Sequence, residues 1–307
     1  MNRAIVVVGS LNMDFVVRVA HLPAPGETIL GREFQTIPGG KGANQAYAAA
    51  KLGADVRMIG RVGYDVFGDQ LKASLAAAGA DVSRVHAARG VSTGVALIWV
   101  DDLGQNSIVV APGANSSIVP ADAQAMRPAF REAGFALFQL ETPLASVTAA
   151  MRVARDSGCS TILDPAPAQP LAREVLELVD VLTPNESEAR LLFGQEITRP
   201  IDAEAAPAVA RDLLALGPQA IILKLGAGGC YYASANEAFH VAGFSVAATD
   251  TTAAGDTFNA AFAVGCSQGM EVREALRYAN AAAAVSVTRL GAQASAPTHE
   301  ETIRLLG

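Results

Sequence analysis

The stretch "DTTAAGDTFNAAFA", residues 250–263, places one acid beside backbone that carries very little side-chain bulk. Asp256 follows Ala253, Ala254 and Gly255 and opens an apolar run that predicts a helix. The first N–H groups of a helix have no partner within it, and together with the helix dipole they favour an anion such as a phosphate. The acid could accept a proton from a hydroxyl that attacks the phosphorus. It could equally do no more than complement the helix dipole.

A second cluster of small residues, "IPGGKGANQA" at 37–46, precedes another predicted helix. Its glycines expose backbone N–H groups, and Lys41 and Asn44 add side-chain donors, which suits a ligand with many hydroxyls. The spacing is not that of a phosphate-binding Walker loop, since no Ser or Thr follows Lys41. A tight strand-to-helix turn explains the glycines as well.

Polar side chains follow two of the predicted strands. Asn12 and Asp14 in "GSLNMD" end the first strand, and being two apart they point the same way along an extended chain. Such a pair can bind adjacent hydroxyls of a sugar, or it can be a polar strand end. Glu141 in "QLETP" ends another strand, where side chains face the ligand crevice of open α/β folds. The alternative is a solvated strand terminus.

The segment "TPNESEA", residues 183–189, ends a strand and opens a helix. Asn185 and Glu188 are three residues apart, a spacing that is typical of a capping box. The same pair could instead orient water molecules on Mg²⁺, which keeps most of its waters in proteins.

Strand and helix patterns alternate along most of the chain. Short branched apolar runs predict buried strands at 4–9, 56–63, 135–141, 161–167, 179–185 and 220–226. Amphipathic patterns between them predict helices at 42–53, 66–79, 143–158 and 205–217. This alternation predicts an α/β fold with a doubly wound, mostly parallel sheet flanked by helices on both faces.

Two segments interrupt the alternation, and neither has a helical pattern. Residues 15–38 predict strands around a Pro/Gly turn, and residues 94–111 predict a hairpin with "DDLGQN" as its loop. We expect both to form a small β lid at the carboxyl ends of the parallel strands. The whole chain, 1–307, is then one α/β domain that carries this lid.

The composition is that of a compact cytoplasmic enzyme. A net charge of −7 on 307 residues argues against binding nucleic acid or a membrane surface. The three cysteines are odd in number, are far apart and form no CxxC motif, which favours reduced thiols. The sequence shows no signal peptide, no apolar run long enough to cross a membrane and no histidine spacing typical of a metal site.

Together these stretches resemble the ribokinase-type family of carbohydrate kinases. "GGKGANQAYAAAKLGADVRMIGRVG" (39–63) is similar to the amino-terminal signature of that family, and "DTTAAGDTFNAAFA" is similar to its carboxyl-terminal one. The shorter stretches "GSLNMD", "LETP", "TPNESEA" and "TRLGAQAS" occur in the expected order between and beyond them. The resemblance covers essentially the whole chain and implies a ribokinase-like fold.

The resemblance implies ATP-dependent phosphorylation of D-ribose at its 5-hydroxyl, with Asp256 as the base. The catalytic turn would comprise Asp256 with the anion hole formed by Ala253, Ala254 and Gly255. The sugar would contact Asn12, Asp14, Gly40, Lys41, Gly42, Ala43, Asn44, Glu141 and Asp256. ATP would lie against Asn185, Lys224, Leu225, Gly226, Ala227, Gly228, Gly229, Gly255 and Asn280.

The resemblance also implies ions and a partner. Asn185 and Glu188 would bind Mg²⁺, or another divalent ion, through water molecules. A monovalent cation, usually K⁺, would lie behind the anion hole. Its ligands, several of them backbone carbonyls, would come from Asp250, Thr252, Ser286, Arg289, Gly291 and Ser295. A homodimer would form through the β lid.

Some alternatives stay open. Lys224 stands where pentose kinases of this family commonly carry Thr, while sugar-acid and hexose kinases often have Lys, so it could reach an ATP phosphate or only pair with an acid. Another small substrate is therefore possible: a nucleoside, fructose or a keto-deoxy sugar acid. A non-catalytic sugar sensor would not need Asp256 or the Asn185–Glu188 pair. A dinucleotide oxidoreductase is excluded, because "VVVGSLNMD" lacks the further glycines of that fingerprint.

Overall fold

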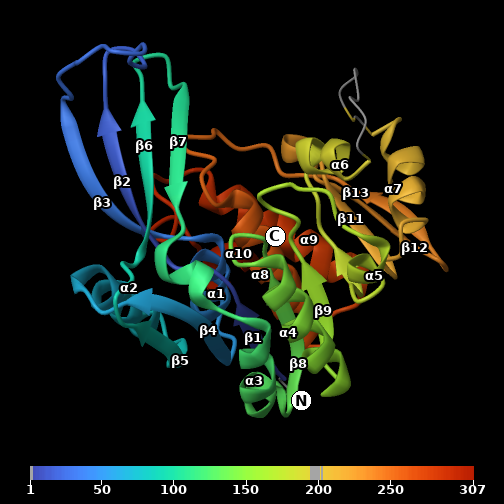
Figure 1. The fold of residues 1–307 in the computed structure, drawn as a ribbon. Coiled ribbons are helices and arrows are strands. Elements are labelled where there is room, and N and C mark those ends of the chain that lie inside the picture. The colour runs from blue at the N-terminus through green and yellow to red at the C-terminus, as the bar shows by residue number, and fades with distance from the viewer. Residues whose placement is uncertain (1–2, 194–200, 202) are drawn as a thin grey trace.

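In the computed structural model, which describes residues 3–193, 201 and 203–307, two sheets organise the chain (Figure 1). Among these residues nine strands form the main sheet, in the order β13-β12-β11-β10-β9-β8-β1-β4-β5. The seven strands from β11 to β5 pair parallel, whereas β12 and β13, at the other end of this order, are joined by antiparallel pairing. Their bounds are β1 Ala4–Val8, β4 Val56–Gly63, β5 Asp81–Ala88, β8 Ala133–Phe138, β9 Ser160–Leu163, β10 Val181–Leu182, β11 Ala220–Lys224, β12 Cys230–Ser234 and β13 Ala238–Val241.

Helices cover both faces of this sheet, and the buried strand β1 shows why. Ile5 and Val7 belong to one core cluster, whereas Val6 and Val8 belong to the other, as alternating side chains of a strand must. The first core is shared with α1 (Lys41–Lys51), α2 (Val66–Ala77), α8 (Ala254–Ser267) and α9 (Val272–Ser286). The second is shared with α3 (Ala123–Phe130), α4 (Leu144–Asp156), α5 (Arg173–Leu176), α6 (Glu186–Leu192) and α7 (Ala206–Leu214). The last helix, α10 (His299–Leu306), packs against α9.

The predicted α/β fold is confirmed, and each of the predicted strands and helices has a counterpart within a few residues. The strands β5, β12 and β13 were not predicted, and neither were the helices α3, α5, α9 and α10. The pattern of β5 explains the omission for that strand. Only Val85 is buried in it, so the sequence shows no continuous apolar run.

The lid is a second sheet with the strand order β3-β2-β6-β7, standing above one end of the main sheet in Figure 1. Its strands are β2 (Asn12–Arg18), β3 (Glu33–Gly39), β6 (Gly94–Val100) and β7 (Asn106–Ala111). The central pair, β2 and β6, is parallel, and the edge strands pair antiparallel with them. Three short 3₁₀ turns complete the elements: η1 (Gly113–Ser117), η2 (Pro120–Asp122) and η3 (Gly226–Gly228).

One sequence-based assignment is wrong. Asn12 and Asp14 do not end the first strand, because β1 stops at Val8 and the two residues open the lid strand β2. The break lies at residues 9–11, where the chain passes against helix α1. A Cβ on Gly42 would lie 2.7 Å from backbone atoms of Gly9 and Ser10, so strand and helix approach too closely there for larger residues.

None of the helices in the described part of the chain is both long and apolar enough to cross a lipid bilayer.

Candidate active site

A cleft of about 550 Å³ separates the lid sheet from two loops of the main domain. One face of the lid lines it, through alternate side chains of β2 such as Asp14 and Val16. The opposite wall comprises residues 248–252 and 290–292. The carboxyl-terminal signature thus contributes to the wall facing the lid, as the switch-point rule predicts.

The turn before helix α8 exposes unpaired backbone donors beneath this wall. Ala253 adopts the left-handed conformation, with φ of 57°, which is uncommon for a residue other than glycine. The N–H of Ala254 donates to the carbonyl of Thr251, but those of Gly255 and Asp256 have no partner among the described residues. A strained backbone conformation of this kind persists only where the surrounding structure holds it in place. Since it leaves two N–H groups free at the start of a helix, this turn can bind an anion.

Asp256, the first acid of α8, is buried at 5% exposure and is fixed from both sides. Its Oδ2 accepts a hydrogen bond from Asn44 Nδ2 at 3.1 Å, and its Oδ1 accepts one from Gln45 Nε2 at 3.1 Å. Burial raises the pKa of Asp256 to about 6, while Lys41 opposes the rise and Asp164 adds to it. A carboxylate with such a pKa is ionised at neutral pH and is still a useful proton acceptor.

Asn44 presents an unused acceptor next to this carboxylate. Its Oδ1 is buried and has no hydrogen-bond partner in the described structure. Orphaned buried polar atoms are rare in proteins, so the atom is suited to receive a ligand hydroxyl. Gly40, with φ of 90°, lets the chain turn into α1 so that Asn44 faces Asp256.

Glu141 connects three segments rather than lying free in solvent. Its Oε2 accepts hydrogen bonds from Ser10 Oγ and from the backbone N–H of Lys41, and the Nδ2 of Asn12 lies 3.5 Å away. The carboxylate therefore sits at the N-terminus of α1, where the helix dipole favours it. It also orders the segment that enters the lid.

Asp14 and Lys41 both have strongly shifted pKa values next to Asp256 and Glu141. Burial raises the pKa of Asp14 to about 7, with the charges of Glu141 and Asp256 adding to the rise and Lys41 opposing it. Burial opposes the charge of Lys41, yet the surrounding acids, Asp256 first among them, hold its pKa above its usual value. The site thus concentrates negative charge that Lys41 only partly offsets.

Asn185 and Glu188, expected near the nucleotide, form the capping box of α6. Asn185 Oδ1 accepts from the N–H of Glu188 at 2.9 Å, and Glu188 Oε2 accepts from the N–H of Asn185 at 2.7 Å. Burial raises the pKa of Glu188, although Lys224 opposes the rise. Asn280 donates to the backbone carbonyls of Val241 and Ala242 at 3.2 Å, and so holds the end of β13.

Lys224 pairs with an acid, which was one of the two roles considered for it. Its Nζ lies 3.1 Å from Asp164 Oδ1, and both side chains are nearly buried, at 11% and 3% exposure. The same ammonium borders the anion-binding turn, since a Cβ on Gly255 would lie 3.4 Å from it. The loop 225–229 follows directly, with η3 at its centre.

The residues expected around a monovalent cation form two loops joined by Asp250. Its Oδ1 accepts from the N–H of Thr252 at 2.9 Å, and its Oδ2 accepts from the N–H of Gly291 at 2.9 Å. The hydroxyls of Ser286 and Ser295 donate to nearby backbone carbonyls, and Arg289 forms an ion pair with Glu301. No cluster of three His, Cys, Asp or Glu side chains suited to a metal occurs among the residues that the structure describes.

Sequence reasoning missed Gln45, Asp164, Ser10 and Asn115. Gln45 follows Asn44 in the same signature. Asp164 lies inside the predicted strand at 161–167, and only the end of β9 at Leu163 shows that it is the first residue after the strand. Asn115 gave no signal, because it lies in a 3₁₀ turn beyond the lid. There its side chain bonds both backbone groups of Leu11 and donates to Asn12 Oδ1 at 2.8 Å.

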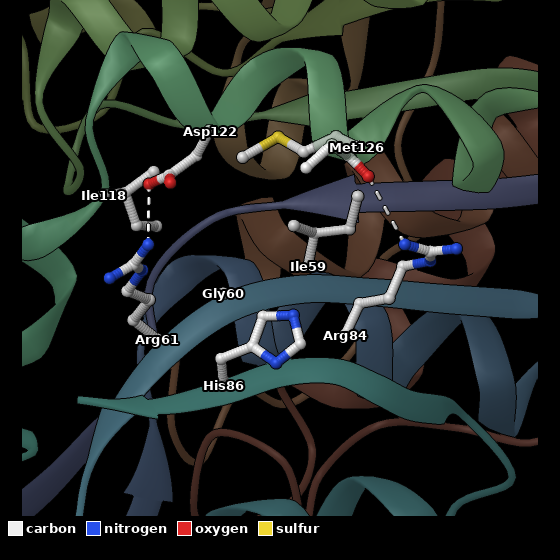
Figure 2. A pocket seen from close by; sticks show the side chains of 9 residues that line it. Ile59, Gly60, Arg61, Arg84, His86, Ile118, Asp122 and Met126 are labelled. Carbon is white, nitrogen blue, oxygen red and sulfur yellow. Dashed lines mark hydrogen bonds and ion pairs between the residues drawn. The ribbon is translucent and has the colours of Figure 1, made fainter.

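A smaller cavity of about 80 Å³ lies between β4, β5 and α3 and shares no residue with the cleft (Figure 2). Arg61 and Asp122 face each other across it in an ion pair of 2.7 Å. His86 and Arg84 line it from β5. It contains none of the predicted site residues.

Comparisons with known proteins agree with this geometry. Residues 2–299 match the model of the pfkB family carbohydrate kinases. The chain is 41% identical over 306 residues to the ribokinase of Haemophilus influenzae, covering all of this chain and 99% of that one. It is also 41% identical over 304 residues to the ribokinase of Bacillus subtilis, covering 99% of each.

Solved structures show the same fold over the same length. The ribokinase of Thermotoga maritima superposes with a TM-score of 0.88 at 38% identity, covering 99% of each chain. The ribokinase of Arabidopsis thaliana, complexed with ribose and ATP, superposes with a TM-score of 0.90 at 34% identity, covering 100% of this chain and 99% of that one. The chain therefore belongs to the pfkB family of carbohydrate kinases.

Proposed function

We propose that this protein transfers the terminal phosphoryl group of ATP to the 5-hydroxyl of D-ribose, with Asp256 as the base. One observation carries the proposal: the buried carboxylate of Asp256 lies at a turn with two unpaired N–H groups and next to the unused acceptor of Asn44. The full-length similarity to ribokinases, one of them solved with ribose and ATP, indicates which sugar and which donor.

In the reaction, Asp256 accepts the proton of the sugar hydroxyl as its oxygen bonds to the γ-phosphorus and the bond from that phosphorus to ADP breaks. The N–H groups at 253–256 receive the charge on the phosphoryl oxygens, which is the main task of an enzyme in phosphoryl transfer. Asn12, Asp14, Lys41 and Asn44 hold the sugar hydroxyls in line. Lid closure over the cleft keeps water away from the phosphoryl group.

ATP and Mg²⁺ fit the residues on the other side of the turn. Burial, together with the charge of Asp164, raises the pKa of Glu188 although Lys224 and Lys41 oppose the rise, and a nearby cation would favour its charged form. We propose that Asn185 and Glu188 hold Mg²⁺ through water, and that 224–229, Gly255 and Asn280 contact the nucleotide. When bound, the metal neutralises charge on the phosphate oxygens.

We propose K⁺ at the loops that Asp250 joins. The expected donors there are oxygens, and backbone carbonyls suit a weakly hydrated monovalent cation. Because Asp250 is already hydrogen-bonded to Thr252 and Gly291, the loops are held together before any ion binds. The cation would stiffen the turn that carries the unpaired N–H groups.

We also propose that two copies pair through the lid, in the cytoplasm where ATP is abundant. The edge strand β7 is exposed along its whole length and carries apolar side chains at Ile108, Val109 and Val110. Uncovered apolar edges of this kind are rare in monomers.

A sugar panel with detection of ADP tests the substrate. D-ribose should have the highest kcat/KM, ahead of fructose, adenosine and a keto-deoxy sugar acid. A different best substrate would overturn the ribose assignment and leave the kinase assignment intact. Sugar binding without any ADP formation would instead favour a sensor.

Asp256→Asn should lower kcat by about 10²–10⁴-fold, the usual contribution of a general base, while ATP and ribose still bind.

In the unmodified enzyme, kcat/KM should fall about tenfold per pH unit below pH 6, because protonated Asp256 cannot accept a proton. Steady-state kinetics between pH 5 and 9, with calorimetry for binding, measure both. A variant with near-normal turnover would remove Asp256 from this role.

Potassium should stimulate turnover, because a cation at 250–252 and 286–295 orders the anion-binding turn. We expect at least a several-fold higher kcat in K⁺ than in tetramethylammonium at equal ionic strength. Equal rates in the two salts would contradict the site. Asp250→Asn should abolish the difference between them.

Asp14→Asn should stabilise the protein without sugar at pH 8, and weaken ribose binding. The pKa of Asp14 is about 7 in the folded chain, compared with its ordinary value of 3.8. Because the folded state therefore binds this proton more tightly than the unfolded state, the fold becomes less stable as the pH rises from 4 through 7. Removing it should raise the free energy of unfolding by about 1–2 kcal/mol at pH 8 after allowance for partial exposure. Near pH 4 the difference should disappear.

Urea denaturation at both pH values measures this effect. Asp102→Asn is the control, since Asp102 is exposed and paired with Arg32, and its loss should cost at most about 1 kcal/mol. Destabilisation by Asp14→Asn at pH 8 would contradict the proposal that the charged carboxylate of Asp14 destabilises the fold.

A further inference from the structure

Gln45 occupies a central position in the site, although neither face of its amide is open to the cleft. It is 1% exposed, and its Nε2 donates one hydrogen bond to Asp256 Oδ1 and another to Asp164 Oδ2, each at 3.1 Å. Its Oε1 accepts from Gln139 Nε2 at 2.6 Å. Both carboxylates can only accept and Gln139 donates, so the orientation of the Gln45 amide is determined.

Asp164 continues this network to the anion-binding turn. Its other oxygen, Oδ1, holds the ammonium of Lys224, which lies against Gly255. A single line of contacts therefore runs from the base, through Gln45 and Asp164, to the cation beside the unpaired N–H groups. Its members come from α8, α1, the end of β9 and the end of β11.

We propose that Gln45 is a positioning residue for the phosphoryl transfer, which fixes the carboxylate of Asp256 and ties it to the Asp164–Lys224 pair at the anion-binding turn. The inference rests on the proposed kinase reaction and adds a residue that touches neither sugar nor phosphate. Gln45 acts only through the groups on either side of it.

The amide solves an electrostatic problem. Asp164 and Asp256 approach closely enough to share one –NH₂ group, and two like charges at that separation repel strongly in a buried site. Gln45 gives each carboxylate a donor, while the second oxygen of Asp164 stays paired with Lys224. With Asn44 on Oδ2, it leaves Asp256 a single orientation toward the sugar.

Two influences on the base have opposite signs, which provides a specific test. The hydrogen bond from Gln45 lowers the pKa of Asp256, whereas the charge of Asp164 raises it. The other charged groups around Asp256 are Lys41 on α1 and Asp14 on β2. Glu141 after β8 acts on both of these, Glu188 on α6 acts on Lys41, and Lys224 on β11 acts on Asp164. All of them stay unchanged in the first variant.

Gln45→Met keeps the side-chain length and removes every hydrogen bond. We expect kcat to fall about 10- to 100-fold, the scale of a misplaced catalytic group, while KM for ribose changes by less than about threefold. Thr161→Val is the control, since it also removes a buried hydrogen-bonding group, one that bonds Leu178 and Asp180 outside the site. It should lower stability and leave kcat unchanged.

The pH profile separates positioning from packing. The acidic limb of kcat/KM should move to higher pH by about half a unit or more in Gln45→Met, and to lower pH in Asp164→Asn. A purely structural defect would lower rates without moving the two limbs in opposite directions. Limbs that stay in place or move together overturn the proposal, as does a kcat within threefold of the unmodified enzyme.

If Gln45→Met does not fold, Gln139→Leu removes only the bond that orients the Gln45 amide. It should shift the limb in the same direction by a smaller amount, and an unchanged limb would count against the proposal. The proposed function fails separately. Absence of ribose-dependent ADP formation in the unmodified enzyme refutes the reaction, whereas normal kinetics in these variants refute only the role of Gln45.

Discussion

Negative charge gathered around an anion-binding turn is the constraint on which this site depends. Asp14, Asp164 and Asp256 gather near a turn with unpaired N–H groups, to which we assign the phosphate, although like charges repel. Lys41 and Lys224 offset part of this charge, and the amides of Asn44 and Gln45 offset part of it by hydrogen bonding. We propose that binding of sugar, nucleotide and cations relieves this repulsion. A trade of stability for function of this kind is common at active sites.

The fold brings these groups together from distant parts of the sequence. Parallel strands end at one edge of the sheet, so β9 and β11 deliver Asp164 and Lys224 to neighbouring positions. Helices α1 and α8 lie on the same face of the sheet and pack against each other, and this contact places Asn44 and Gln45 against Asp256. No single segment could form the site, because each carboxylate is positioned by a neighbour from another element.

Much of this arrangement could be predicted from the sequence. Branched runs and glycine-terminated helices gave the parallel sheet, and the two signatures gave Asp256, Lys41 and Asn44. The edge strand β5 escaped detection because it is too exposed to show a continuous apolar run. Gln45 and Asp164 escaped because their role lies in pairing across about 120 residues, and residue type alone does not reveal a partner. The break after β1 was missed for a similar reason, since the approach of Gly42 to Gly9 is a tertiary contact.

The lid strand β2 begins with the residues that we assign to the sugar, and this sets limits on how the protein can change. Asp14 faces the cleft, with Asn12 on the same side of the strand, only because β2 keeps its register with β3 and β6 over seven residues. Inserting or deleting one residue between 12 and 18 would turn alternate side chains to the opposite face. Length variation in this half of the lid is therefore confined to the connection at 19–32. New sugar preferences must arise by exchanging side chains on β2, not by altering its length.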